Sequence, residues 1–464
     1  MGWKVARLVA KMEPAPCGRH PAEEDRNLKT RDGKAIARGA LIGIVVLVVL
    51  VFALIGVLSV TRGTPVQSVR SVGSGGLPAA GDESFARAIQ LHTGTTLLPG
   101  NEVQLLFNGE GTYPVLWRDL RGARRAIAVQ MYYAMPGAVA DTMAAILAER
   151  ARAGVRVLVL LDAFGAGAMR GDWPRQLRAA GATVAWLRPL RWYSLHRAAN
   201  RSHVRVVLVD GDIGYTGGFG LADYWMGSGL RPGEWRETNV RFRGPAVAQL
   251  QATFAAGWAE ATGELLTGPL LFSTHAGRPR GTVRAALMHT IPTVGSTPAE
   301  RYLALTIAGA RRTLYVANSY FVPDDDFRRF LTDAVRRGVD VRVLTAGPRS
   351  DVQTTLYAGR ARYEELLRGG VKIYEYQPAM MHAKTIVVDG MWCSIGTMNF
   401  DNRSLAFNDE NTLIALDGDL GARMDAMFLA DLRHARRITL PEWRRRPWYE
   451  RAKELGANLV SRVL

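Results

Sequence analysis

The sequence carries one unusual string of polar residues twice, 179 residues apart. Both copies have the form H-x-[K/R]-x4-D-x6-G, and each encloses a short apolar run that is typical of a strand. The two copies are His203-Val204-Arg205 with Asp210 and Gly217, and His382-Ala383-Lys384 with Asp389 and Gly396. Packing alone does not explain a histidine, a cation and a carboxylate at identical spacing in two halves. The repeat therefore predicts one active site assembled from two copies of a single unit.

Other segments repeat in the same order. Gly122-Ala123-Arg124-Arg125 returns as Gly309-Ala310-Arg311-Arg312, and each copy precedes an apolar run rich in aromatic residues. This period is too long for a solenoid, whereas 464 residues accommodate a duplicated domain. Short Val/Ile/Leu strands alternate with amphipathic helices, for example over residues 141–153 and 325–337. The pattern predicts an α/β fold in which helices cover a buried sheet.

Residues 39–60 form an uncharged segment between Arg38 and Arg62. As a helix the segment would span about 33 Å, enough for the ~30 Å hydrocarbon core of a bilayer. A signal peptide rarely follows a charged prefix of 38 residues, and a buried helix would show a polar face. We therefore predict a single transmembrane helix. Residues 1–38 hold nine Lys/Arg against five Asp/Glu, which favours a cytoplasmic N-terminus and an extracytoplasmic catalytic part.

The net charge of +17 suits an anionic partner, either lipid headgroups or nucleic acid. Residues 61–84 are rich in Gly, Ser and Pro and are predicted to be a linker. Cys17 and Cys393 lie on opposite sides of the predicted membrane helix, so we expect no disulfide within the chain.

The C-terminal segment 433–464 is basic, with nine Lys/Arg and three Asp/Glu. Trp443 and Trp448 interleave with arginines, and apolar residues follow at roughly helical spacing. One interpretation is an amphipathic helix that lies at an anionic membrane surface with its tryptophans at headgroup level. The alternative is a terminal helix packed on the second domain.

The spacing within each motif indicates the chemistry. On a strand, residues i and i+2 point to the same face, so His203 projects with Arg205 and His382 projects with Lys384. If the halves meet face to face, one imidazole can attack phosphorus while the other donates a proton. The two cations can hold phosphate oxygens. This set predicts phosphodiester displacement through a phosphohistidine, without a metal or other cofactor.

The paired motif H-x-K-x4-D-x6-G-[S/G/T]-x-N resembles that of the phospholipase D superfamily, above all of bacterial cardiolipin synthases. Residues 381–404 carry most of the resemblance, together with Tyr320-Phe321-Val322-Pro323-Asp324 and Trp235-Arg236-Glu237-Thr238. The resemblance extends from about residue 85 to the C-terminus. It implies two tandem domains, residues 85–266 and 283–432, each with a mixed sheet between helices and related by a pseudo-twofold axis.

The resemblance also implies roles for individual residues. The two histidines would be nucleophile and general acid/base, and Arg205, Lys384 and Asn399 would cradle the phosphate. An acidic residue downstream of each motif would hydrogen-bond the histidine of that motif, and Glu237 and Glu410 occupy these places. The candidate catalytic residues are His203, His382, Arg205, Lys384, Asp210, Asp389, Glu237 and Glu410, of which the two aspartates are expected to hold the strand and turn. The candidate substrate-binding residues are Asn399, Thr397, Gly218, Tyr133 and Tyr320.

The first motif departs from the family pattern at two positions, with Arg205 in place of lysine and Gly220 in place of asparagine. Arginine keeps the charge on a wider planar group. Glycine removes an amide donor, a loss that can cost ~10²–10³ in rate. We expect Arg205→Lys to change activity modestly and Gly220→Asn to raise it, provided that the side chain fits the local backbone.

The resemblance, together with the predicted membrane helix, thus implies a phosphatidyltransferase anchored in the bacterial inner membrane. A phosphatidyl group would pass from phosphatidylglycerol to the hydroxyl of a second lipid, giving cardiolipin and glycerol. The expected partners are anionic phospholipid and the membrane, and nucleic acid is not expected. Three alternatives stay open: a phospholipase D that uses water or another alcohol, an outward-facing nuclease, and a lipid-binding scaffold with a degenerate first motif.

Overall fold

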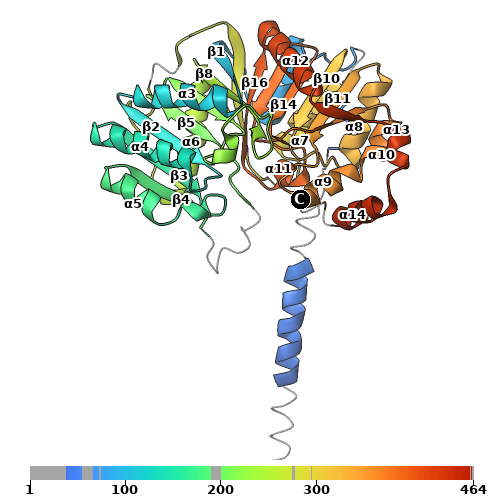
Figure 1. The fold of residues 1–464 in the computed structure, drawn as a ribbon, viewed down its shortest axis with the longest axis horizontal. Helices are drawn as coiled ribbons and strands as arrows, with labels where there is room; N and C mark the ends of the chain where they lie inside the picture. Colours follow the sequence, from blue (N-terminus) through green and yellow to red (C-terminus); the bar gives the residue numbers. More distant parts are fainter. Residues whose placement is uncertain are drawn as a thin grey trace, which may run out of the picture. The chain divides into compact units, whose positions relative to one another are not determined.

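The computed structural model describes residues 38–54, 66–72, 75–189, 200–273, 277–293, 295–459 and 461. The chain divides into two compact units, Met1–Thr61 and Arg62–Leu464. In the first unit, residues 38–54 are helical and their side chains are exposed (Figure 1). Among the described residues, no helix is both long and apolar enough to cross a membrane. The predicted span 39–60 continues into residues 55–60, which lie outside the described ranges, as does Cys17.

The second unit is built on one mixed sheet of 15 strands (Figure 1). Both halves of the chain contribute strands in the same order, counted outward from the centre. The first half contributes β1 (Leu98–Phe107), β8 (Thr238–Arg243), β6 (Ile213–Gly217), β5 (Val206–Val209), β2 (Ala126–Met131), β3 (Arg156–Asp162) and β4 (Thr183–Leu187). The second half contributes β9 (Val283–Thr290), β16 (Glu410–Leu416), β15 (Trp392–Gly396), β14 (Lys384–Val388), β10 (Thr313–Asn318), β11 (Asp340–Ala346) and β12 (Lys372–Tyr376), with β17 (Ala435–Ile438) at the edge. β1 and β9 pair antiparallel and join the two halves.

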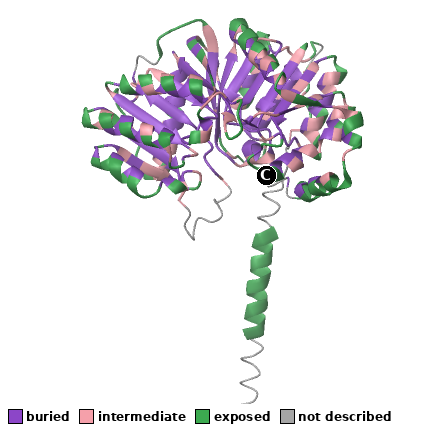
Figure 2. Ribbon diagram, viewed as in Figure 1, coloured by how far each residue is buried: buried purple, intermediate pink, exposed green. Residues whose placement is uncertain are grey.

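Helices cover both faces of this sheet, and the strands between them are buried (Figure 2). On one face, α6 (Ala246–Thr262) and α12 (Gly418–Leu432) share a single apolar cluster that crosses from one half to the other. On the other face each half has its own cluster. α3 (Asn108–Arg121), α4 (Ala138–Arg152) and α5 (Asp172–Ala179) cover the first half, and α2 (Glu83–Thr93), α7 (Pro298–Gly309) and α8 (Asp325–Arg336) cover the second. The predicted α/β fold with a sheet between helices is confirmed.

The predicted helix boundaries differ in accuracy for a physical reason. α8 begins at the predicted residue, where the neighbouring Asp324 side chain accepts a hydrogen bond from the Phe327 N–H. α4 begins at Ala138, three residues before its predicted start. The Asp223 carboxylate, 85 residues away in the sequence, accepts hydrogen bonds from the N–H groups of Ala138 and Val139. A helix end stabilised by such a distant residue leaves no local sequence signal.

The segment before the repeat packs on the second half. The Ala80 N–H donates to the Gly309 carbonyl at 3.0 Å. In α2, the Phe85 ring lies 4.9 Å from the Trp392 ring in an edge-to-face contact. The end of the predicted linker and the start of the predicted first domain therefore contact the second half of the chain.

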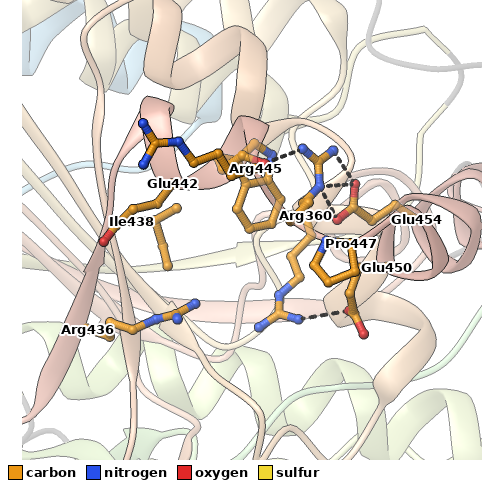
Figure 3. Close-up of a pocket in the computed structure, with 10 residues that line it drawn as sticks. Arg360, Arg436, Ile438, Glu442, Arg445, Pro447, Glu450 and Glu454 are labelled. Atoms are coloured by element: carbon orange, nitrogen blue, oxygen red, sulfur yellow. Dashed lines mark hydrogen bonds and ion pairs between the residues drawn. The ribbon is translucent and has the colours of Figure 1, made fainter.

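The C-terminal segment also packs against the second half. β17 pairs antiparallel with β12, and Trp443 of α13 (Leu440–Arg444) is buried with its ring 5.0 Å from that of Tyr363. α14 (Trp448–Leu459) buries Glu454, which forms an ion pair with Arg446. Between these elements lies a pocket of about 330 Å³ that contains no candidate site residue (Figure 3). Packing, one of the two alternatives for this segment, thus holds for Trp443, whereas Trp448 is 79% exposed.

Candidate active site

The two motif aspartates fix the turns that follow β5 and β14. Both have positive φ angles, 53° for Asp210 and 55° for Asp389. The Asp210 carboxylate accepts hydrogen bonds of 2.7–3.1 Å from the N–H groups of residues 124–126. The Asp389 carboxylate accepts them equivalently from residues 311–313. The repeated Gly-Ala-Arg-Arg segment therefore supplies backbone donors to the motif aspartate, and neither aspartate lines the cavity described below.

Each motif histidine lies beside the cation two residues further on, as the strand spacing predicts. Arg205 Nη1 is 3.2 Å from His203 Nε2 and donates to the His203 carbonyl at 3.3 Å. Lys384 Nζ is 2.9 Å from His382 Nε2 and donates to the His382 carbonyl at 2.6 Å. All four residues are buried. Arg205 thus makes the same two contacts in the first motif that Lys384 makes in the second.

The two glutamates pair with the histidines in a crossed arrangement. Glu410 accepts a hydrogen bond from His203 Nδ1 at 2.8 Å, and Glu237 accepts one from His382 Nδ1 at 2.5 Å. The expectation that each glutamate bonds the histidine of its own motif is therefore wrong.

The backbone explains this crossing. The His203 N–H donates to the Asp409 carbonyl at 2.9 Å, and the His382 N–H donates to the Arg236 carbonyl at 2.8 Å. β13 (Met380–Met381), which precedes His382, pairs in parallel with β7 (Trp235–Arg236), which precedes Glu237. Correspondingly, Ser202, which precedes His203, forms a parallel β-bridge with Asp409, which precedes Glu410. Each histidine is thus hydrogen-bonded through its backbone to the segment that carries the glutamate of the opposite half.

Both histidines open into one cavity of about 580 Å³. Of the predicted substrate-binding residues, Tyr133, Tyr320 and Asn399 line the cavity, whereas Thr397 and Gly218 do not. Thr397 Oγ1 donates to Glu410 Oε2 at 2.5 Å. A Cβ atom at Gly218 would lie 2.2 Å from Glu237 Oε2, so this glycine leaves room for the carboxylate. These two residues support the glutamates and do not face the cavity.

Burial sets the protonation of the site. Burial, followed by the two cations, lowers the pKa of both imidazoles well below the usual value. Burial also lowers the pKa of Lys384 to about 7 and raises that of Glu410 to about 7, and it raises the pKa of Glu237. A neutral imidazole that donates Nδ1–H to a carboxylate presents the Nε2 lone pair to a substrate. Such an imidazole can attack phosphorus.

Several cavity residues were not among the sequence-based candidates. They are the aromatic residues Tyr132, Tyr224, Trp225 and Trp235 and the polar residues Asp351, Asp401, Arg403, Ser404 and Asn408. Asp401, Arg403 and Ser404 lie within the stretch that carries the family resemblance, so position in that stretch was an available signal. Asp351 accepts a hydrogen bond from the Tyr320 hydroxyl at 2.8 Å, a contact that only the fold reveals.

Within the described ranges, no group of three or more His, Cys, Asp or Glu residues could hold a metal ion. Metal-independent chemistry stays a prediction, because only a measurement on the enzyme tests it.

The fold is shared with phosphatidylserine synthase from Haemophilus influenzae. That structure aligns with a TM-score of 0.62 at 13% identity and covers 82% of this chain and 100% of its own. At this identity the likeness concerns the fold alone.

Sequence comparison gives the family. The family described as "Cardiolipin synthase, PLD-like domain" matches residues 303–432. Cardiolipin synthase from Geobacillus kaustophilus is 34% identical over 365 residues, which cover 78% of this chain and 72% of that protein. Cardiolipin synthase A from Pseudomonas syringae pv. syringae is 33% identical over 374 residues, 79% of this chain and 76% of that protein. The chain therefore belongs to the cardiolipin synthase family, with a phospholipase D-like domain, and the resemblance drawn from the motifs is confirmed.

Proposed function

We propose that this enzyme is a phosphatidyltransferase that makes cardiolipin. It transfers the phosphatidyl group of phosphatidylglycerol to the hydroxyl of a second lipid and releases glycerol. The observation that carries the proposal is the pair of imidazoles, each beside its own cation and each bonded to a glutamate, at one cavity of about 580 Å³. The relatives named cardiolipin synthase support the choice of substrate and product.

In the first step, Nε2 of one histidine attacks the phosphorus of phosphatidylglycerol. The bond between phosphorus and the glycerol oxygen breaks, and the second histidine, which enters this step as an imidazolium with a proton on Nε2, gives that proton to the oxygen. We assign the attack to His203, in keeping with the resemblance, and the proton transfer to His382. Arg205 and Lys384, which flank the Nε2 atoms, stabilise the negative charge on the non-bridging oxygens.

In the second step, the hydroxyl of the acceptor lipid attacks the phosphatidyl-histidine. A phosphorus–oxygen bond forms, the phosphorus–nitrogen bond to His203 breaks, and the hydroxyl proton passes to His382. Glu237 stabilises the resulting imidazolium because it accepts the Nδ1–H of His382. The same histidine therefore serves as acid in the first step and as base in the second.

The geometry of Arg205 favours catalysis over the scaffold alternative. A degenerate site would be free to lose the contact between cation and imidazole, yet Arg205 is 1% exposed and makes the two contacts that Lys384 makes. Burying a guanidinium is costly, so its position beside His203 supports a retained function.

We also propose the domain and membrane organisation that the sequence predicts. Residues 85–266 and 283–432 would form two phospholipase D-type domains related by a pseudo-twofold axis. Residues 39–60 would anchor the chain in the inner membrane, with the N-terminus in the cytoplasm and the catalytic unit outside. The uncharged stretch and the basic excess before it support this topology.

The outer face of α14 is proposed to contact the anionic membrane surface. Trp448, Leu455 and Leu459 share one helix face at spacings of seven and four residues and are 79%, 67% and 83% exposed. Arg451 and Lys453 are exposed on either side of this apolar face. An apolar stripe between basic residues matches the pattern of helices that lie at membrane interfaces.

α9 (Gln353–Arg360) connects this surface to the active site. Its first turns contribute Thr355 to the cavity, and its last residue, Arg360, lies 3.8 Å from Glu450 of α14. Tyr357 accepts a hydrogen bond from Lys453 at 3.2 Å. A bilayer in contact with α14 would therefore lie one helix away from the catalytic cavity.

The test is product analysis with the full chain in vesicles that contain phosphatidylglycerol. Thin-layer chromatography should show cardiolipin, and His203→Ala and His382→Ala should each lower its formation by at least ~10³-fold while the melting temperature stays near that of the wild type. Activity should persist in EDTA. Phosphatidic acid as the sole product would favour the phospholipase alternative, and inhibition by EDTA that a divalent ion reverses would contradict metal-free chemistry.

A further inference from the structure

The two halves of the repeat contribute chemically different surfaces to the shared cavity. When Gly217 is matched with Gly396, four glycine or aromatic residues of the first half correspond to polar residues of the second. The pairs are Gly218 with Thr397, Gly220 with Asn399, Tyr224 with Arg403, and Trp225 with Ser404. The motif is thus symmetric in its histidines and cations but not in the residues around them.

Because the backbone of His382 is hydrogen-bonded to the Trp235–Arg236 segment of the first half, His382 lies among the aromatic residues of that half. Its ring is 4.6 Å from that of Trp235 and 5.4 Å from that of Trp225. Tyr224 packs against both tryptophans, with its ring 4.3 Å from that of Trp235 and 4.8 Å from that of Trp225. We call these three residues, Tyr224, Trp225 and Trp235, the aromatic wall. All three line the catalytic cavity.

Trp225 occupies the space where the missing amide of the first motif would lie. A Cβ atom at Gly220 would lie 2.5 and 2.7 Å from two atoms of the Trp225 ring. Trp225 Nε1 also donates to Glu237 Oε2 at 3.4 Å, the same oxygen that accepts from His382. The two positions are therefore coupled: glycine at position 220 leaves room for the indole of Trp225, which takes the place of the amide that the second motif has at Asn399.

His203 lies in a more polar part of the cavity. Glu410, the carboxylate partner of His203, accepts a hydrogen bond from the Thr397 hydroxyl. Arg403 and Asn408 line the cavity on the His203 side. Tyr132 is an aromatic contact of His203, with the rings 4.9 Å apart. Polar side chains of the second half therefore gather at His203, whereas the first half presents aromatic rings to His382.

We propose that Trp225, with the aromatic wall, determines that the phosphatidyl-histidine is transferred to a lipid hydroxyl and is not hydrolysed. Water that attacks the intermediate must be oriented by hydrogen bonds beside the base His382, and the indole faces offer none. A lipid hydroxyl is brought there by its own apolar attachment, which packs against the rings. Both acceptors give up one proton to His382 and break the phosphorus–nitrogen bond. They differ only in the product, cardiolipin from the lipid and phosphatidic acid from water.

This inference rests on the proposed function, and its test is the ratio of phosphatidic acid to cardiolipin made by the full chain in phosphatidylglycerol vesicles. Trp225→Ser places the residue of the second half in the wall, and we expect the ratio to rise at least ~10-fold, the scale on which pocket contacts discriminate substrates. Trp225→Phe keeps an apolar ring and should leave the ratio within ~3-fold of the wild type.

Trp258→Ser is the matched control. Trp258 is equally buried at 1% exposure, and its Nε1–H also donates to a glutamate, Glu264, at 3.3 Å, but it lies in α6 away from the cavity. This variant should lose stability without a change in the product ratio. If Trp225→Ser does not fold, Tyr224→Ser serves in its place, because Tyr224 is only partly buried. Tyr224→Ser should raise the ratio ~10-fold, and a ratio within ~3-fold of the wild type would then overturn the proposal.

Two results would overturn the proposal. In one, both products fall together in Trp225→Ser and the ratio stays constant. In the other, the ratio rises as much in Trp258→Ser as in Trp225→Ser. A wild-type enzyme that makes neither product would instead contradict the proposed function, so the two failures are distinguishable.

Discussion

The substitution Gly220→Asn should weaken the enzyme, although it restores the residue that the family motif contains. The new Cβ atom would lie 2.5 and 2.7 Å from atoms of the Trp225 ring, where carbon–carbon contacts normally measure ~3.5–4.0 Å. Trp225 has little room to retreat, because it is 1% exposed and packs against Trp235 at 4.5 Å. The indole and the backbone of Gly220 must therefore move apart by ~1 Å.

The size of the effect follows from this displacement. Overpacking a buried site costs ~1–3 kcal/mol, which in a protein of this size lowers the melting temperature by ~1–4 °C. The Trp225 ring lies 5.4 Å from that of His382, so its movement also displaces this imidazole, the proposed base. A misplacement of ~1 Å in an active site can cost ~10²-fold in rate.

The assay is scanning calorimetry together with the rate of cardiolipin formation. The double variant Gly220→Asn/Trp225→Ser copies the Asn399 and Ser404 pair of the second half and removes the clash. Its free energy of unfolding should therefore exceed the value that the sum of the two single changes predicts by ~1–3 kcal/mol. A single Gly220→Asn variant with unchanged melting temperature and a raised rate would refute this reasoning and restore the expectation from the motif.

Three further predictions follow from the same geometry. With the full chain in anionic vesicles, a nitroxide at Leu455→Cys should be at least ~3-fold less accessible to a water-soluble relaxation agent than one at Leu91→Cys. Leu91 is the control because it is equally exposed, at 67%. Equal accessibility at the two positions would exclude α14 as a membrane contact. Burial raises the pKa of Asp401 to about 7, so the stability that protonated Asp401 contributes is fully present below about pH 4 and is lost as the pH rises through 7. Asp401→Asn should therefore flatten the fall in melting temperature between about pH 4 and 7, and a slope identical to that of the wild type would contradict the assignment. Arg205→Lys should keep transfer within ~10-fold of the wild type, because Lys384 makes the equivalent contacts, and a loss as large as that of His203→Ala would contradict this equivalence.

The local features of the motif were predictable because they depend on neighbours in the chain. Alternation along a strand places the cation at i+2 beside its histidine, whatever the rest of the fold does. The length of the repeat and its internal order predict a duplicated α/β unit, and the strand order of the sheet repeats accordingly. The resemblance predicts that the motif aspartates hold turns, and they accept backbone N–H groups of the repeated Gly-Ala-Arg-Arg segments.

Other features depended on contacts that no local pattern records. α14 has apolar residues at helical spacing in the sequence, but only the packing of Glu454 shows which face is buried and which is exposed. The motif predicted that asparagine would fit at position 220, because the sequence does not reveal that the Trp225 ring fills the same space. Size complementarity between residues of different elements is a property of the folded protein.

The sequence by itself determined the candidate catalytic groups, their spacing on each strand and the existence of two copies. The tertiary structure decided which glutamate serves which histidine, since the contacts join residues 207 and 145 positions apart. The same crossing places His382 among the aromatic residues of the first half and His203 among the polar residues of the second. Spacing along a strand is set by the geometry of the backbone, whereas the partner of a side chain across the sheet is set by how the two halves pack together.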